Sequence, residues 1–94
     1  YYGIYLTNHQ ASIIDGNVMA DFQSNTSAQG IYLSRTTEMT ITNNRITGQI
    51  GIYGIYMSNM NAPTTSGSQN LIANNVINGD FSSTTPRAIY LVAS

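Results

Sequence analysis

A four-residue motif that reads glycine or alanine, isoleucine, tyrosine and then leucine or methionine occurs four times in this chain. Its copies occupy residues 3–6, 30–33, 54–57 and 88–91, and they begin 27, 24 and 34 residues apart. Self-similarity at a spacing of about 20 to 50 residues is typical of solenoids, propellers and other repeat arrays. The repeat therefore restricts the fold more than any other feature of the sequence.

A second motif, in which an asparagine lies three residues after an isoleucine and two residues before an apolar residue, comes after each of the first three copies. Its asparagines are Asn17, Asn44 and Asn75. The first two follow the glycine of their unit by 14 residues, and the third follows it by 21. The additional residues lie around 61–67, a stretch of proline, serine, threonine and glycine that is typical of an inserted loop.

Alternating side chains within the first motif predict strands. Ile4 and Leu6 share one face of an extended segment, and Tyr5 lies on the other face. The chain is rich in Ile, Thr and Tyr and poor in Glu and Lys, which favours strand over helix. Equivalent positions carry the same residue type, as expected when each coil of a solenoid stacks on the previous one at about 4.8 Å. This identity favours a solenoid over a closed meander.

The Gly-Ile-Tyr-Leu strand, the variable turn and the strand that runs into Asn-Asn resemble the right-handed parallel β-helix repeat of the pectate-lyase-like superfamily. The resemblance implies an all-β solenoid with coils at residues 3–29, 30–53 and 54–87 and a partial coil at 88–94. The superfamily contains lyases, hydrolases, epimerases, tailspikes and non-catalytic surface proteins, so the resemblance does not specify a function. The repeats also look like non-catalytic repeat regions of secreted bacterial surface proteins, which implies an extracellular or cell-surface location.

The resemblance places Asn17, Asn44 and Asn75 in an asparagine ladder at an interior turn. A physical reason supports this placement independently. An inward amide offers a donor and an acceptor to backbone groups that a tight bend leaves unpaired. Stacked amides also bond to one another along the axis. We interpret these asparagines as structural.

Apolar rows are expected to fill the interior of the coils. They consist of Ile4, Ile31, Ile55 and Ile89; Leu6, Leu33, Met57 and Leu91; Ile14, Ile41 and Ile72; and Met19, Ile46 and Ile77, with Phe22, Ile50 and Phe81 at a corner. We expect no cofactor in this core.

A row of tyrosines is the best candidate for a ligand-binding site. Alternation places Tyr5, Tyr32, Tyr56 and Tyr90 on the outer face of the first sheet, in a flat strip of stacked rings. Such a strip can stack on sugar rings, which makes polysaccharide one expected partner, or pack against a neighbouring protein. The alternative is that the aromatic pairs only stabilise the sheet, at about 0.2–1 kcal/mol each.

Charged residues make up only 7% of the chain, with three arginines and no lysine. Binding to nucleic acid or to an anionic membrane requires clusters of basic residues, so we expect neither as a partner. The absence of cysteine excludes disulfides and thiol chemistry. No metal-binding motif is present in the sequence, and we expect no metal site.

The acidic residues do not form a recognisable catalytic site. Asp21 and Asp80 occupy equivalent corners two coils apart, and we interpret both as turn caps. His9 is the only histidine, and no acid lies near it in the sequence to orient it as a base. Asn25 begins a glycosylation sequon, which is a frequent accidental match in a chain with 11 asparagines and 11 threonines. We assign no catalytic residue and do not expect catalysis from this segment alone.

The sequence is compatible with two functions. The first is a structural, spacer or surface-display segment of an extracellular repeat protein, with adhesion or filament formation through end-to-end stacking as further consequences. The second is a glycan-binding or polysaccharide-processing β-helix whose catalytic residues lie outside this segment. Neither end of the sequence resembles a cap, so we expect the partners to be adjacent coils of a longer chain or identical copies.

Overall fold

The computed structural model describes residues 2–20, 22, 26–58 and 70–92. Within these ranges the chain forms ten strands and no helix. The strands are β1 (Tyr2–Thr7), β2 (Ile13–Asp15), β3 (Val18–Ala20), β4 (Gln29–Ser34), β5 (Thr40–Thr42), β6 (Arg45–Ile50), β7 (Tyr53–Ser58), β8 (Leu71–Ala73), β9 (Val76–Phe81) and β10 (Arg87–Val92). Asp21, Asn25 and the insertion at 61–67 lie outside the described residues, and the expectations for them stay predictions.

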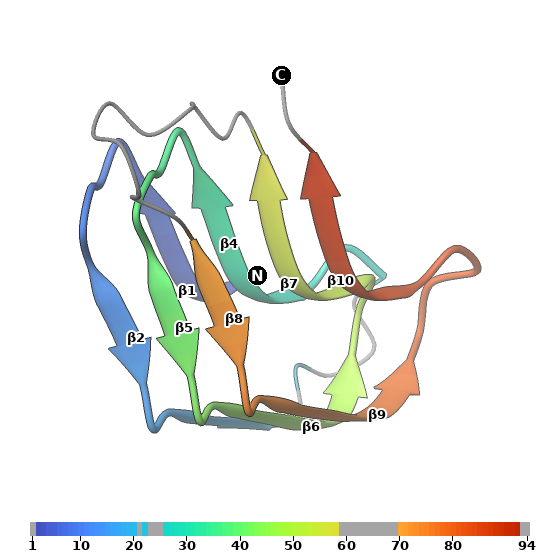
Figure 1. The fold of residues 1–94 in the computed structure, drawn as a ribbon. Helices are drawn as coiled ribbons and strands as arrows, with labels where there is room; N and C mark the ends of the chain where they lie inside the picture. The colour runs from blue at the N-terminus through green and yellow to red at the C-terminus, as the bar shows by residue number, and fades with distance from the viewer. Residues whose placement is uncertain (1, 21, 23–25, 59–69, 93–94) are drawn as a thin grey trace.

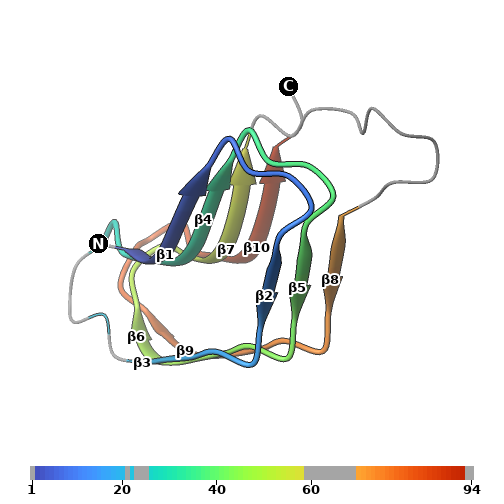
Figure 2. The same cartoon turned by 90° about the vertical axis from the view of Figure 1, so that its left-hand side faces the viewer.

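The strands form three parallel sheets that wind around one interior (Figures 1 and 2). The first sheet has the order β1-β4-β7-β10, the second β2-β5-β8 and the third β3-β6-β9. Each coil contributes one strand to every sheet in turn, so neighbours within a sheet are a full coil apart in sequence. This arrangement confirms the predicted parallel β-helix of about three coils. No helix among the described residues is long and apolar enough to cross a membrane.

Strand pairing places like residues on like residues. In the first sheet Ile31 pairs with Ile4 on one side and with Ile55 on the other. In the second sheet Ile41 lies between Ile14 and Ile72 in the same way. Because a one-residue slip would turn every inward side chain outward, these matched rows fix the register.

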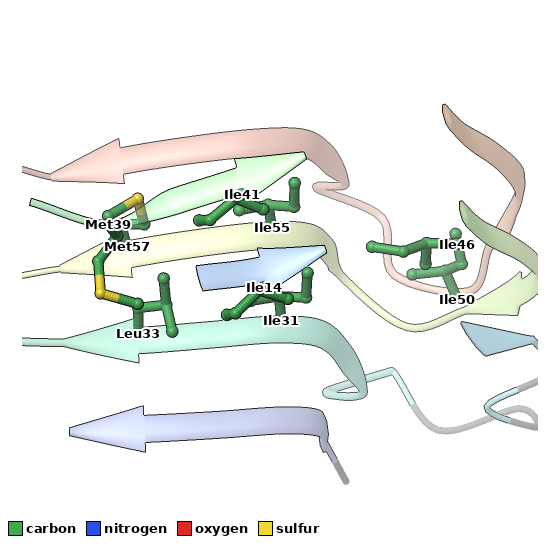
Figure 3. Close-up of a cluster of buried hydrophobic side chains, with 9 residues drawn as sticks. All are labelled: Ile14, Ile31, Leu33, Met39, Ile41, Ile46, Ile50, Ile55 and Met57. Carbon is green, nitrogen blue, oxygen red and sulfur yellow. The ribbon is translucent and has the colours of Figure 1, made fainter. Parts of the chain in front are cut away.

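Nine apolar side chains form the buried core, which the two inner coils contribute almost entirely (Figure 3). They are Ile14, Ile31, Leu33, Met39, Ile41, Ile46, Ile50, Ile55 and Met57. Met39 was not among the expected core residues, because it lies in the turn before β5 rather than in a strand. The other expected interior residues of the first three coils pack against this core and are partly buried, whereas Ile89 and Leu91 of the fourth remain exposed.

The recurring glycine of the motif is explained by the close approach of neighbouring coils. A Cβ atom built on Gly30 would lie 2.6 Å from the carbonyl oxygen of Gly54, and one on Gly54 would lie 2.7 Å from that of Ala88. Real Cβ atoms essentially never approach a backbone oxygen so closely. A side chain is therefore excluded where the first sheet begins in each of these coils.

The two residues of each Asn-Asn pair have different structural roles. The first residue of each pair forms a turn with positive φ, at 56° for Asn43 and 57° for Asn74. Gly16, with φ of 73°, takes this position in the first coil. Asparagine and glycine are the residues that tolerate this conformation best. The second residue of each pair then points its amide along the axis of the coil, as the hydrogen bonds described below show.

Candidate functional site

Six tyrosines and two polar neighbours form a surface on the outer side of the first sheet, which we call the tyrosine face. It consists of Tyr2, Tyr5, Gln29, Tyr32, Tyr53, Tyr56, Arg87 and Tyr90. Strand pairing arranges these residues in two rows, one of four tyrosines and one that runs Tyr2, Gln29, Tyr53, Arg87. Tyr2 and Tyr5 are 46% and 51% exposed.

The second row was missed by the sequence analysis. Strict alternation places Tyr2 on the inner side, because it precedes the inward Ile4 by two residues. The ring of Tyr2 nevertheless lies 4.9 Å from that of Tyr5 and 5.2 Å from that of Tyr32, measured between centroids. Tyr2 pairs with Gln29 and Ile4 pairs with Ile31, on the two sides of the glycine of the motif. The sheet curves near the start of its strands, where this glycine lies (Figure 1). Tyrosine precedes the glycine in two of the four copies, at Tyr2 and Tyr53, and this was the sequence signal that could have found the row.

The four predicted tyrosines do not form the flat strip that we expected. Tyr5 and Tyr32 are stacked, with centroids 4.9 Å apart and planes at 9°, and Tyr56 and Tyr90 are stacked at 5.2 Å and 11°. The two pairs meet edge to face, since Tyr32 and Tyr56 lie at 78°. The ring quadrupole favours such edge-to-face contacts, and this preference interrupts the strip between the second and third coils.

Arg87 and Gln29 give the tyrosine face its polar groups. The guanidinium carbon of Arg87 lies 4.2 Å from the centroid of the Tyr90 ring, a cation–π contact. Arg87 is the only charged residue within β1, β4, β7 and β10. The Oε1 atom of Gln29 is buried and accepts no hydrogen bond within the structure. An unpaired buried acceptor costs about 1–3 kcal/mol, so a ligand donor that reached it would find a favourable partner.

Hydrogen bonds join Asn17, Asn44 and Asn75 into a ladder along the interior turn. The Oδ1 atom of Asn44 accepts from the backbone N–H and the Nδ2 of Asn17, both at 3.0 Å. The Oδ1 atom of Asn75 accepts from the same two groups of Asn44, at 3.0 and 2.9 Å. Two of the amides also bind the strand of the previous coil. The Nδ2 of Asn44 donates to the Ile14 carbonyl, and that of Asn75 donates to the Ile41 carbonyl. All of these bonds join one coil to its neighbour.

The acidic and imidazole groups are dispersed over the described surface. His9 is exposed in the turn after β1, and Asp80 is exposed on β9 opposite Gln49. Across residues 2–20, 22, 26–58 and 70–92, no three His, Cys, Asp or Glu side chains gather in a group that could hold a metal ion. The structure thus brings the predicted tyrosines together in one group and the predicted asparagines together in another. Asp80 and His9 remain apart from one another.

Asp15 is the one carboxylate in the described structure with specific partners of its own. Its Oδ1 accepts from the Thr42 hydroxyl at 2.7 Å and from the Asn43 amide at 2.9 Å. The bond from Thr42, followed by that from Asn43, lowers the pKa of the Asp15 carboxyl below its ordinary value. Both partners belong to the next coil, so Asp15 links coils at the surface rather than forming a site for chemistry.

The comparisons with known proteins provide one match. A model of the family described as "Periplasmic copper-binding protein (NosD)" matches residues 1–90. No curated protein and no solved structure matches the chain. The pectate-lyase-like assignment therefore stays a prediction, whereas the repeat pattern and the three parallel sheets agree with the family match. Because that match covers nearly the whole sequence, the chain belongs to the NosD family.

Proposed function

We propose that this chain is a structural segment of a repeat protein located outside the cytoplasm, and that it functions by stacking its end coils against further strands. The family description names the periplasm, which supports a compartment on the extracytoplasmic side. Display at the cell surface and adhesion are narrower roles within the same proposal. The observation that carries it is the contrast between equivalent inward residues of inner and end coils.

Inward residues that are buried in the inner coils are uncovered in the last coil. Ile55 is 0% exposed, whereas Ile89 one coil later is 46% exposed. Leu33 is 0% exposed, whereas the equivalent Leu91 is 50% exposed. At about 25 cal/mol per Å² of apolar surface, covering such side chains favours association with further strands.

The three sheets also indicate which strands fit this end. The first sheet has four strands and the other two have three, so β10 extends one strand beyond β8 and β9. Strands that continue the coil would complete the second and third sheets beside β10. A second copy that paired its β1 with β10 would join the first sheet alone and leave a gap over β8 and β9. Continuing strands therefore cover more apolar surface than an identical copy does.

Light scattering after size exclusion, over a range of protein concentrations, tests this proposal. We expect reversible self-association of the isolated chain, because a copy covers the open end in part. Leu91→Thr should reduce that association. Ile13→Thr is the matched control, since Ile13 is 72% exposed but lies on the outer face of β2, away from the open end. A strictly monomeric chain at high concentration, or equal effects of the two variants, would contradict the proposal.

Glycan binding is the second candidate function, and the tyrosine face favours it. Tyr2 and Tyr5 are half exposed, and Gln29, whose Oε1 is buried without a hydrogen-bond partner, lies in register between Tyr2 and Tyr53. Exposed aromatic rings provide apolar faces on which sugar rings can stack. A panel of oligosaccharides, with intrinsic tyrosine fluorescence and thermal shift as readouts, tests this function. Binding that Tyr5→Ala and Gln29→Ala weaken would support it, and the absence of binding to every glycan would exclude it for this segment.

Copper binding, which the family description names, is not supported by the described residues. Copper is bound in proteins by imidazole, thiolate and thioether groups. The chain has one histidine and no cysteine, and His9 is exposed and isolated. Among the described methionines, Met39 and Met57 are fully buried among hydrocarbon side chains of the core (Figure 3). Met19 packs against this core, and no His, Cys, Asp or Glu cluster accompanies it in the described residues. These donors do not fit a copper site, and the proposed structural function includes no copper chemistry.

A further inference from the structure

We propose that the tyrosine face is a site of oxidative cross-linking, at which Tyr5 couples to Tyr32 and Tyr56 couples to Tyr90 as dityrosine. The co-reactant is a one-electron oxidant of the peroxidase class together with hydrogen peroxide. The product would be a covalent bond between consecutive coils across the first sheet. This inference concerns the outer face of the sheet and is independent of the open ends on which the proposed function depends.

Ring geometry selects these two pairs. The centroids of Tyr5 and Tyr32 are 4.9 Å apart with planes at 9°, and those of Tyr56 and Tyr90 are 5.2 Å apart with planes at 11°. Both pairs are in register on neighbouring strands, so their side chains leave the sheet side by side and in the same direction. The ring carbons next to the two hydroxyl groups are therefore neighbours, and small rotations about the side-chain torsions bring them together. The edge-to-face pair Tyr32–Tyr56, at 78°, lacks this alignment.

Access to the rings supports the same inference. The tyrosines lie on the outer side of the sheet, with Tyr5 half exposed and Tyr32, Tyr56 and Tyr90 partly exposed. An oxidant can therefore reach at least one ring of each pair without unfolding the coils. Strand pairing holds the second ring within about one strand spacing of the first, so a radical formed on one ring meets its partner in the same molecule.

The chemistry balances with the named oxidant. Each phenol loses one electron and one proton from its hydroxyl group and becomes a neutral phenoxyl radical. The two radicals form a carbon–carbon bond between ring positions next to the oxygens, and the two ring hydrogens then move to those oxygens. Two tyrosines and one hydrogen peroxide thus give one dityrosine and two water molecules. The protein loses two hydrogen atoms in total, which a mass spectrometer detects.

Because the chain has no cysteine, a dityrosine bond could provide the covalent link between coils that a disulfide provides in other proteins. A covalent link between two positions on the chain stabilises a fold mainly by restricting the unfolded state. A dityrosine between coils would act in this way, at a place where the strands already hold the two rings together.

Peroxidase treatment of the intact chain, followed by trypsin digestion and mass spectrometry, tests the inference. Trypsin cleaves after Arg35, Arg45 and Arg87, since the chain has no lysine. A Tyr56–Tyr90 bond would join peptides 46–87 and 88–94, and a Tyr5–Tyr32 bond would form a loop within peptide 1–35. We expect both products, with blue dityrosine fluorescence, in a monomeric fraction and at a yield that dilution does not lower.

Two phenylalanine variants identify the coupled rings of the second pair, Tyr56 and Tyr90, without removing their packing. Tyr56→Phe should abolish most of the joined peptide, because it removes one hydroxyl group of the stacked pair. Tyr53→Phe is the matched control and should retain it, although the Tyr53 ring also lies 5.2 Å from Tyr90, with planes at 37°. Loss in Tyr53→Phe with retention in Tyr56→Phe would overturn the assignment. Cross-links found only between molecules, or no dityrosine under conditions that couple free tyrosine, would overturn the proposal as a whole.

Discussion

The inner coils and the end coils of this β-helix carry almost the same residues in different surroundings. Leu33 in β4 and Leu91 in β10 occupy equivalent positions of one motif, yet the first is fully buried and the second is half exposed. Inner strands pair on both edges, whereas β1 and β10 pair on one edge only. For equivalent residues of this fold, burial thus depends on the number of neighbouring coils.

This difference shows that burial in this fold depends on stacking between neighbouring coils. In repeat proteins stability is approximately a sum of terms within repeats and terms between nearest neighbours. Within the described segment, β1 and β10 lack a neighbour on one edge of the first sheet. The proposed stacking would supply the missing neighbours.

The largest effect is expected from truncating an inner core residue. Ile55→Ala should lower the free energy of unfolding by about 2–5 kcal/mol, because it removes buried methylene groups and leaves a cavity between two coils. Ile89→Ala, at the equivalent position of the last coil, should cost only about 1 kcal/mol, because its side chain is already half in water. Urea unfolding followed by circular dichroism measures both. Equal losses would contradict the difference between inner and end coils.

In the asparagine ladder, too, truncating an inner residue should lower the free energy of unfolding more than truncating an end residue, by a smaller difference than in the core. Asn44→Ala should lower the free energy of unfolding by about 2–3 kcal/mol, because it leaves the Ile14 carbonyl and the amide groups of Asn17 without their partner. Asn17 bonds to a neighbouring coil on one side only, so Asn17→Ala should cost about 1 kcal/mol or less. The same unfolding measurements compare the two variants. A greater loss in Asn17→Ala would mean that the ladder does not stabilise the inner coil.

Two strained turn residues provide a case in which inner and end coils should behave alike. Ala11 and Glu38 take equivalent places in the first two coils, and both have φ of 56°, a conformation that disfavours side chains other than asparagine and glycine. Ala11→Gly and Glu38→Gly should each raise the free energy of unfolding by up to about 1 kcal/mol, because the strain of the side chain is relieved. Thermal unfolding by calorimetry tests this expectation. A clear loss of stability in either variant would show that its side chain makes contacts that outweigh the strain.

The smallest effect concerns the pH dependence that Asp15 contributes. Hydrogen bonds from Thr42 and Asn43 lower the pKa of Asp15 in the folded state. The stabilisation is therefore fully present above the pKa of the unfolded chain, which is about 3.9 for aspartate. It is lost as the pH falls through the lower pKa of the folded state. Urea midpoints of the wild type and of Asp15→Asn should differ slightly at neutral pH and converge in acid, and a difference that grew in acid would contradict the sign of the shift.

The strands and the inward rows could be predicted from the sequence because stacking repeats the same residue in every coil. Ile31 and Tyr32 recur at matching positions, and their alternation assigns one to the interior and the other to the surface. Met39 could not be predicted as buried, because it follows Glu38 in an irregular turn to which strand alternation does not apply.

The candidate site was predicted in part for similar reasons. The row of four tyrosines follows from alternation, but Tyr2 and Tyr53 reach the same face through the bend at the recurring glycine, which a period of two does not describe. The perpendicular arrangement of Tyr32 and Tyr56 depends on ring electrostatics and on neighbouring side chains, which a sequence pattern does not encode.

Native-state hydrogen exchange along the first sheet, measured at low protein concentration, tests the central difference most directly. We predict the strongest amide protection in β4 and β7, which pair on both edges, and weaker protection in β1 and β10, which have one free edge. Raising the concentration should increase protection in β1 and β10 as copies cover the ends. Protection in β10 equal to that in β4 and β7 at high dilution would contradict the account of buried inner coils and open end coils.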